Sequence, residues 1–191
     1  MRYTITILAA LLVGCSGVGH VATSDPNRKI HQAYSLMSED RLLLAEDMIR
    51  QALVSFETAG DKSGMAEAYN AYGNLYKNDL YINGRWKTKF KELGTYDGTY
   101  MKSIENFSKC QDLYKQIGDG SGEAKCLLGI GNAYSLRGEP ENACDYYKKS
   151  LAIYNDAKQA GSNFKEPQMF TGYKNMGELV KAFIKEEGCG I

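Results

Sequence analysis

Histidine and cysteine are the side chains whose spacing most often reveals chemistry, and both are scarce in this sequence. Of the two histidines, His20 and His31, neither lies near cysteines or carboxylates at a spacing typical of a metal site or a catalytic triad. The glycine-rich residues 118–122 follow no strand pattern, so we interpret them as a turn between helices and not as a phosphate-binding loop. Paired acids such as Glu186 and Glu187 are typical of a solvated helix end. The sequence therefore predicts a protein that is not an enzyme and that uses no metal and no cofactor.

The composition favours a single helical domain without a nucleic-acid partner. A chain of 191 residues with 43% hydrophobic and 24% charged residues is long enough and apolar enough for one sizeable core. Its 23 basic and 23 acidic residues give a formal net charge of zero, so no global field attracts a polyanion. Only three prolines interrupt a sequence rich in Leu, Ala, Lys and Glu, which favours helices.

The first residues are typical of an export signal. Arg2 precedes an apolar stretch, residues 5–13, that is shorter than the roughly 20 residues needed to span a bilayer. The stretch ends in Leu12-Val13-Gly14-Cys15, which resembles the lipobox of bacterial lipoproteins. That resemblance implies cleavage before Cys15 and attachment of acyl chains such as palmitate to it, which would anchor the protein to a membrane. Ordinary secretory cleavage with loss of Cys15 is the alternative.

The segment after Cys15 is predicted to be a flexible tether, because it is rich in Gly and Ser. Ser16 resembles the sorting signal of outer-membrane lipoproteins, which implies a lipid-anchored protein of the bacterial outer membrane that faces the periplasm. The predicted organisation is a signal peptide (residues 1–14), a lipidated cysteine with its tether (15–27) and a helical domain (28–191).

Four cysteines follow the predicted lipidation site, and they allow three pairings: Cys110, Cys126, Cys144 and Cys189. Export would bring them into an oxidising compartment, where disulfides persist. Cys110 and Cys126 lie at equal separations on either side of Gly118, so they fall at similar heights on two antiparallel helices. A disulfide between them is one interpretation, and two small buried packing residues are the other. Cys189, close to the end of the sequence, is predicted to be mobile and able to cross-link partners.

An internal repeat organises the rest of the chain. A shift of 58 residues aligns two segments without a gap, pairing Gly60-Asp61 with Gly118-Asp119 and Gly73-Asn74 with Gly131-Asn132. A second shift, of 40 residues, relates Phe107 to Tyr147. Periods between 20 and 50 residues are typical of stacked helical or mixed units, each of which needs its neighbours to bury its apolar face.

The repeated residues resemble the tetratricopeptide repeat (TPR). The pattern Leu127-x2-Ile130-Gly131-x2-Tyr134, followed by Ala143-x3-Tyr147, is similar to the two helices of that repeat, and residues 69–76 and, more weakly, 173–180 repeat its first helix. The resemblance covers roughly residues 40 to 187. It departs from the 34-residue form in two ways: its turns are about six residues longer, and the repeats at either end of the domain match the pattern poorly. It implies an all-α fold, a TPR-like solenoid of helical hairpins with about three repeats in a right-handed superhelix.

The glycines of the repeat are predicted to lie where paired helices cross. A glycine inside a helix costs about 1 kcal/mol relative to alanine, and close packing of Gly73 and Gly131 against small residues of the second helices, Ala45, Ser103 and Ala143, would offset that cost. The predicted helices span residues 28–37, 41–59, 63–77, 100–117, 122–137, 140–158 and 167–187. The first of them fits the repeat poorly, so we interpret it as a helix that caps the end of the solenoid.

One repeat is enlarged. Ser103 follows Tyr76 by 27 positions, whereas Ala143 follows Tyr134 by nine, so 18 residues are inserted at about positions 78–98. Insertions in solenoids are often functional, and this one mixes basic and aromatic residues. We interpret it as a partner-binding segment, with the alternative that its aromatic rings fold back to cover an exposed edge. The candidate residues are Arg85, Trp86, Lys87 and Phe90.

A second candidate binding surface is the concave groove that the first helices of successive TPR repeats line. The resemblance implies that asparagine and lysine side chains there contact a bound peptide, with lysines pairing with carboxylates. The residues at matching positions are Asn70, Asn74, Lys77, Lys125, Asn132, Ser135, Lys174 and Lys181.

The expected function is that of a lipid-anchored periplasmic scaffold. It would bind another protein through its repeats and help to assemble or position a cell-envelope, secretion or pilus machine, with an architecture that resembles pilotin-type and assembly-factor lipoproteins. Alternatives are an adaptor of cell-wall enzymes and a surface-exposed adhesion protein. The predicted partners are a protein or peptide and, through the lipid, a membrane.

Overall fold

The computed structural model describes residues 23–161, 164–167 and 172–190. Within these ranges the chain forms helices and no strands, which confirms the predicted all-α class. The predicted signal peptide, Cys15, His20 and most of the tether lie outside the described residues. The helices are α1 (Pro26–Ser38), α2 (Leu42–Ala59), α3 (Lys62–Tyr76), α4 (Asp79–Ile82), α5 (Lys87–Glu92), α6 (Met101–Ile117), α7 (Gly120–Leu136), α8 (Pro140–Ala160) and α9 (Met176–Glu186).

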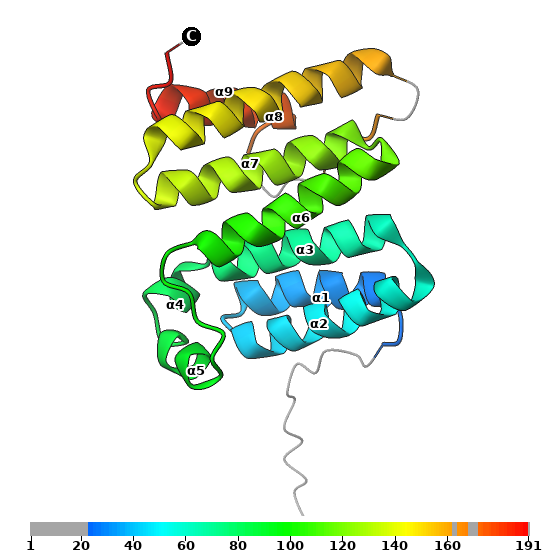
Figure 1. Cartoon of the computed structure of the whole chain (residues 1–191), viewed down its shortest axis with the longest axis vertical. Coiled ribbons are helices and arrows are strands. Elements are labelled where there is room, and N and C mark those ends of the chain that lie inside the picture. The colour runs from blue at the N-terminus through cyan, green and yellow to red at the C-terminus, as the bar shows by residue number, and fades with distance from the viewer. Residues whose placement is uncertain (1–22, 162–163, 168–171, 191) are drawn as a thin grey trace, which may run out of the picture.

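Three antiparallel hairpins stack side by side to form the solenoid. The pairs are α1 with α2, α3 with α6, and α7 with α8, and α9 packs on α8 at the C-terminal end (Figure 1). Contacts also join α2 to α3 and α6 to α7, so each hairpin buries apolar surface against the next. Helix α1 pairs with α2 as the first helix of the first hairpin, so it is part of the stack and not only a cap.

The turns between helices follow from a repeated glycine–aspartate pair. Gly60 ends α2 with φ +67°, a left-handed conformation that favours glycine, and the Asp61 carboxylate then accepts a hydrogen bond from Gly64 N at 2.9 Å. Gly118, with φ +72°, and Asp119 repeat this arrangement between α6 and α7. One residue therefore stops each helix and the next begins the following one.

The predicted close approach at the repeat glycines is confirmed. The Ser103 hydroxyl donates a hydrogen bond to the Gly73 carbonyl oxygen at 2.7 Å, across the α3–α6 crossing. A Cβ placed on Gly131 would lie 2.6 Å from the Tyr147 ring and 3.3 Å from the Ala143 carbonyl oxygen. A side chain at either glycine would push the helices apart.

The last helix begins later than the sequence analysis predicted. Residues 172–175 are not helical, and α9 begins at Met176, not at 167. The Asn175 side chain accepts a hydrogen bond from Glu178 N at 3.0 Å, which satisfies a free amide at the start of the helix. The cap and the glutamate three residues beyond it were readable signals of this boundary.

The insertion, residues 78–98, folds back against one end of helices α2 and α3. Helices α4 and α5 lie beside α2 and α3 (Figure 1) and surround two fully buried rings, Tyr81 and Phe90, whose centroids are 4.8 Å apart. The Asp40 carbonyl oxygen accepts hydrogen bonds from Trp86 Nε1 at 2.8 Å and from Arg85 Nη2 at 2.9 Å. The geometry favours the alternative in which the insertion covers an edge.

Burial corrects one of the insertion's candidate residues. Phe90 belongs to the main apolar cluster, so the prediction that it contacts a partner is wrong. Trp86 is half-buried against the same cluster, Arg85 is exposed and Lys87 is half-buried. For these three residues a partner-binding role stays a prediction.

Candidate functional site

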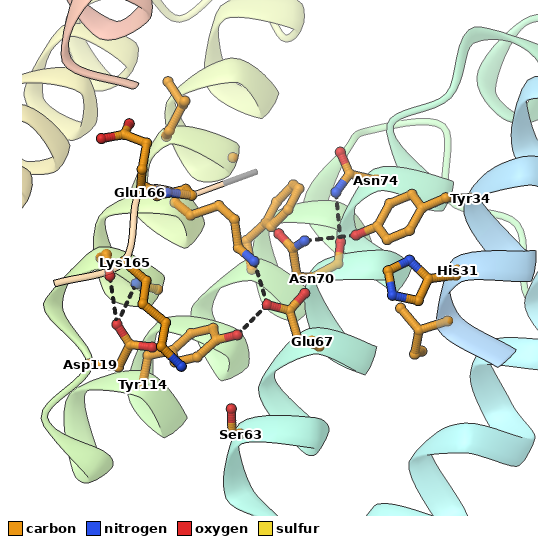
Figure 2. Close-up of a pocket in the computed structure, with 18 of the residues that line it drawn as sticks. His31, Tyr34, Ser63, Glu67, Asn70, Asn74, Tyr114, Asp119, Lys165 and Glu166 are labelled. Atoms are coloured by element: carbon orange, nitrogen blue, oxygen red, sulfur yellow. Dashed lines mark hydrogen bonds and ion pairs between the residues drawn. The ribbon is translucent and has the colours of Figure 1, made fainter. Parts of the chain in front are cut away.

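A concave groove crosses the first helices of the three hairpins. Its larger part, with a volume of about 540 Å³, is lined by side chains of α1, α3 and α7 and by residues 165–167, with α6 behind them (Figure 2). A smaller part of about 430 Å³ continues toward α9. Both parts share Asn74, Lys77 and Asn132, so they form one surface that runs from the first hairpin to the last helix.

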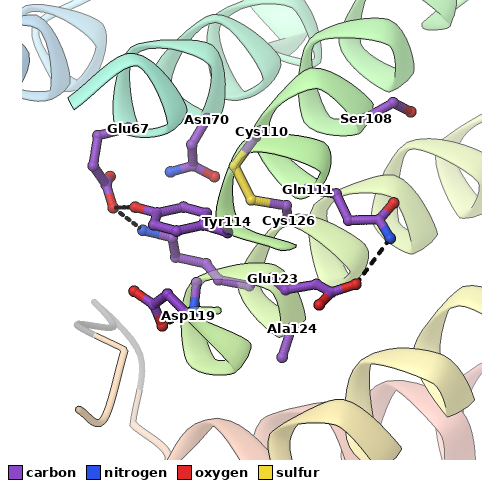
Figure 3. Close-up of a disulfide and its surroundings, with 12 residues drawn as sticks. Glu67, Asn70, Ser108, Cys110, Gln111, Tyr114, Asp119, Glu123, Ala124 and Cys126 are labelled. Carbon is purple, nitrogen blue, oxygen red and sulfur yellow. Dashed lines mark hydrogen bonds and ion pairs between the residues drawn. A yellow bond between two sulfur atoms is a disulfide. The ribbon is translucent and has the colours of Figure 1, made fainter. Parts of the chain in front are cut away.

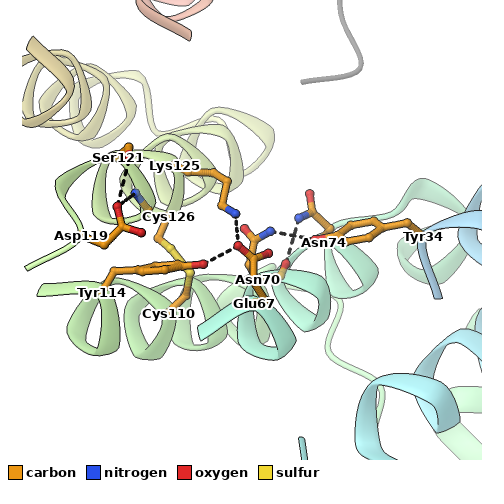
Figure 4. Close-up of polar contacts among 11 residues, drawn as sticks. Tyr34, Glu67, Asn70, Asn74, Cys110, Tyr114, Asp119, Ser121, Lys125 and Cys126 are labelled. Atoms are coloured by element: carbon orange, nitrogen blue, oxygen red, sulfur yellow. Dashed lines mark hydrogen bonds and ion pairs between the residues drawn. A yellow bond between two sulfur atoms is a disulfide. The ribbon is translucent and has the colours of Figure 1, made fainter. Parts of the chain in front are cut away.

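A charged cluster lies at the centre of the larger part. The Glu67 carboxylate of α3 accepts hydrogen bonds from the Tyr114 hydroxyl of α6 and from the Lys125 ammonium of α7 (Figure 4). Burial, with the Glu67 charge as a second cause, raises the pKa of the Tyr114 phenol, which therefore stays protonated and donates. Three helices from two hairpins thus meet at one carboxylate. The positive charge of Lys125 is therefore paired within the protein.

A second set of contacts fixes the wall nearest to α1. Asn70 Nδ2 donates to the Tyr34 hydroxyl oxygen at 2.7 Å, and Asn74 Nδ2 donates to the Asn70 carbonyl oxygen at 2.8 Å (Figure 4). Burial raises the pKa of the Tyr34 phenol, and the Glu67 charge adds to that effect. Asn70 is itself buried, so it holds α1 against α3 as well as lining the groove.

Lys77 lies where the two parts of the groove meet. It follows the last residue of α3, and its ammonium lies 5.7 Å from the centroid of the Phe107 ring. Among the described residues, no carboxylate forms an ion pair with Lys77, whereas Glu67 pairs with Lys125. Burial lowers the pKa of Lys77 to about 8, because the charged form loses hydration that no carboxylate replaces.

The part of the groove toward α9 is acidic on its far side. Glu186 and Glu187 line it together with the rings of Tyr147 and Phe183, which stack 5.6 Å apart. Glu187 accepts a hydrogen bond from the Ser135 hydroxyl at 2.8 Å. Glu186 and Glu187, interpreted from sequence as a solvated helix end, therefore also form one wall of the groove.

The structure brings together most residues of one of the two candidate sets, the set predicted to line the concave groove. Asn70, Asn74, Lys77, Lys125 and Asn132 all line the groove, together with Ser135. Lys174 and Lys181, on the C-terminal side, do not line either part, and neither do the four candidates of the insertion. Asn132 also accepts a hydrogen bond from the Tyr147 hydroxyl at 2.9 Å, so part of its capacity is used within the hairpin.

The sequence analysis missed the carboxylate at the centre of the groove. The signal was present in the repeat, because the shift of 58 that aligns the two glycines also places Glu67 opposite Lys125. Opposite charges at equivalent positions of adjacent repeats are placed to meet across the first helices. His31 and Tyr34 of α1 were missed because the first hairpin is too divergent for the repeat pattern to place them.

All four cysteines that follow Cys15 are paired in the structure. Cys110 of α6 is bonded to Cys126 of α7, with their Cα atoms 5.9 Å apart, and the bond lies beside Tyr114 and Glu67 (Figure 3). Cys144 of α8 is bonded to Cys189, with Cα atoms 5.5 Å apart. Cys189 is buried, so the prediction of a mobile cysteine that cross-links partners is wrong.

Residues 95–156 match the tetratricopeptide repeat family model. The match spans α6, α7 and most of α8, the part of the chain in which the sequence pattern is strongest. No curated protein matches the chain.

The matched family is in general a non-catalytic protein-interaction fold, so the repeats indicate a scaffold that binds another protein. Among the described residues, no cluster of three or more His, Cys, Asp or Glu side chains is placed to hold a metal ion. None of the described helices is both long and apolar enough to cross a bilayer.

Proposed function

We propose that this protein is an exported, lipid-anchored scaffold whose TPR-like groove binds a segment of another cell-envelope protein. By this binding it helps to assemble or position an envelope, secretion or pilus machine. The observation that carries the proposal is the groove itself, which crosses all three hairpins and ends at α9.

The shape of the groove favours a peptide segment over a compact small molecule. Its two parts are joined through Asn74, Lys77 and Asn132, so an occupant that fills both is long and narrow. Extended and helical segments have that shape, and both dock on helical surfaces through side-chain anchors and polar contacts. The internal contacts of Glu67, Asn70 and Lys125 fix the floor before anything binds, which reduces the entropy lost on binding.

Two observations support export. The sequence ends its apolar N-terminal stretch with the lipobox-like residues 12–15. The four remaining cysteines pair as two disulfides, an arrangement that is common in exported proteins and rare in reducing compartments. A lipid on Cys15 would leave nine residues, 16–24, between the lipidated cysteine and Asp25, which precedes α1.

Site-specific photo-cross-linking tests the groove as the binding surface. We expect a photoreactive residue at His31 or at Leu136, both exposed and both lining the groove, to form adducts with the same partner in intact cells. The matched control is Val54 on α2, which is equally exposed and lies outside the groove. Adducts from Val54 alone would refute the groove as the binding surface. A partner that is a cell-wall enzyme or a host surface protein would instead support the adaptor or the adhesion alternative.

Replacement of the lipidated residue tests the anchor. The Cys15→Ser variant cannot form a thioether with a diacylglyceryl group, so we expect it to move from the membrane fraction to the soluble fraction of lysed cells. Metabolic labelling with radioactive palmitate should mark the natural protein and not the variant. A variant that remains with the membranes contradicts the lipid anchor while leaving the groove untouched.

A further inference from the structure

The insertion carries a basic outer surface that its packing does not explain. Residues 80–91 contain four cationic side chains and no Asp or Glu, in a chain whose formal net charge is zero. We call these four side chains the basic patch: Arg85, Lys87, Lys89 and Lys91. The rings that the insertion buries, Tyr81 and Phe90, are uncharged, so the burial that holds it in place does not come from the basic patch.

Two lysines of the basic patch have no anionic partner. The ammonium groups of Lys87 and Lys91 lie 5.7 and 5.3 Å from the centroid of the Tyr96 ring. Among the described residues, no carboxylate forms an ion pair with either lysine. A ring attracts a cation without neutralising it, so both charges are available to an anion outside the protein.

The other two cations of the basic patch form only exposed ion pairs. The Arg85 guanidinium lies 3.9 Å from the Asp40 carboxylate, and the Lys89 ammonium lies 3.0 Å from the Glu92 carboxylate. All four of these side chains are more than half exposed, and ion pairs so open to water contribute little to stability. Since two acids face four bases, the outer surface of α5 keeps a net positive charge.

The basic patch lies at the end of the solenoid at which the tether enters. Helix α5 lies beside the first hairpin, at the opposite end of the stack from α9 (Figure 1). Trp86 Nε1 donates to the Asp40 carbonyl oxygen just beyond the C-terminal end of α1, whereas Asp25 caps the N-terminal end of that helix. The 13 residues of α1 span about 20 Å, and the nine residues between Cys15 and Asp25 reach at most about 30 Å. A lipid on Cys15 would therefore hold the basic patch within reach of the same membrane.

We propose that the basic patch docks on the anionic phospholipid surface of the membrane that holds the lipid of Cys15. This inference rests on the lipid anchor of the proposed function, and it assigns the orientation of the anchored domain. The ammonium and guanidinium groups meet the lipid phosphates, since each basic side chain near an anionic leaflet is attracted to it. The side chain of Leu93, which is 53% exposed directly after α5, enters the boundary between headgroups and acyl chains.

The placement of the basic patch favours a lipid surface over an acidic protein. Its four cations line neither part of the groove, so they do not surround a site that would hold one protruding acidic side chain. A membrane needs no such site, because its phosphates are numerous and meet cations on any exposed surface. The tether also keeps the membrane close at all times, whereas a protein partner has to be recruited.

Docking by this end of the solenoid leaves the groove open. The groove crosses the first helices of the three hairpins and ends at α9, and no residue of α5 lines it. The α9 end therefore stands away from the membrane, and the basic patch and the groove are occupied at the same time by different partners.

Fluorescence of Trp86 tests the docking, because this is the only tryptophan of the chain and its ring lies 5.5 Å from the Arg85 guanidinium. Residues 15–191 are coupled through the Cys15 thiol to a maleimide lipid in vesicles; the other four cysteines are paired with one another. This artificial anchor makes the result independent of whether cells lipidate Cys15. The vesicles consist of phosphatidylcholine alone or with about one third phosphatidylglycerol, and both carry a lipid with a spin label on its headgroup.

We expect the spin label to quench Trp86 in the anionic vesicles and not in the neutral ones. Salt at about 1 M should abolish the quenching, because it shortens the screening length to about 3 Å. Equal quenching in both kinds of vesicle would show that the tether alone brings the insertion to the surface, and would overturn the recognition of lipid charge.

Paired lysine variants identify the charges responsible. Lys87→Gln/Lys91→Gln should lower the ratio of docked to undocked protein by about 25-fold, or roughly five-fold per charge, whereas Lys87→Arg/Lys91→Arg should dock as the natural protein does. The matched control is Lys149→Gln/Lys158→Gln on α8, which removes the same charge from two lysines that also lie over tyrosine rings. Emission of Trp86 without vesicles confirms that the insertion of each variant is folded.

Two further results would overturn the docking. One is quenching that is unchanged in Lys87→Gln/Lys91→Gln. The other is a photoreactive residue at Thr88, exposed on α5, that forms adducts in intact cells with an acidic protein and none with lipid. Neither result touches the lipid anchor, which is tested separately by palmitate labelling and whose failure would leave the vesicle result standing.

Discussion

Replacing Phe107 with alanine is expected to lower the free energy of unfolding by about 3–5 kcal/mol, the range for a large aromatic ring lost from a packed core. Phe107 is 1% exposed, and its ring occupies the space left by two glycines on different helices. A Cβ on Gly73 of α3 would lie 2.7 Å from the ring, and one on Gly129 of α7 would lie 2.6 Å from it. The ring therefore joins the second hairpin to the third, and both lose packing when it is removed.

Urea denaturation followed by far-UV circular dichroism measures this effect. Val54→Ala is the matched control, because it also truncates an apolar side chain but on an exposed face of α2, and its effect should stay within about 0.5 kcal/mol. A loss of less than about 1 kcal/mol in Phe107→Ala would mean that the two hairpins are held together mainly elsewhere. Because Phe107 also lies under Lys77 in the groove, the variant should bind peptides less well even where it remains folded.

The glycine pattern made half of this contact predictable. Gly73 and Gly131 recur at the same point of the repeat, and a helix interior does not tolerate glycine without a packing reason, so helix crossings were expected there. Gly129 has no counterpart, because the shift of 58 places it opposite Ala71. The contact between Phe107 and α7 follows from the angle between hairpins, which repeat spacing does not specify.

The residues that line the groove could be predicted from the sequence, but the hydrogen bonds and ion pairs among them could not. Repeat positions placed Asn70, Asn74, Lys77 and Asn132 on one face, since residues at equivalent places in stacked helices face the same way. Whether a side chain on that face is free or engaged depends on what its neighbours offer. Among the described residues, Lys125 forms an ion pair with Glu67 and Lys77 forms none with a carboxylate, and that difference appears only when three helices are placed together.

The insertion and the last helix mark where sequence reasoning failed. Short helices such as α4 and α5 carry too little periodicity to be recognised, and the burial of Phe90 depends on contacts with helices far away in the sequence. Local patterning also did not pair Cys189 with Cys144, because disulfide connectivity depends on where helix ends meet.

Removal of the Cys144–Cys189 disulfide is expected to lower the free energy of unfolding by about 4 kcal/mol. The bond closes a loop with a sequence separation of 45 residues, and the chain-entropy model assigns a loop of that size about this stabilisation. The Cys110–Cys126 bond, with a separation of 16, should contribute about 3 kcal/mol by the same reasoning. Paired Cys→Ala variants, compared by urea denaturation under non-reducing conditions, measure both.

The two disulfide variants should also lose local stability in different parts of the fold. Helix α9 packs mainly on α8, and the bond to Cys189 ties the residues after its C-terminal end to that helix. Without the bond, α9 should exchange amide hydrogens faster than α3 or α7, whereas loss of Cys110–Cys126 should loosen the junction of the second and third hairpins. Unchanged exchange in α9 would show that packing on α8 holds the helix without the covalent bond.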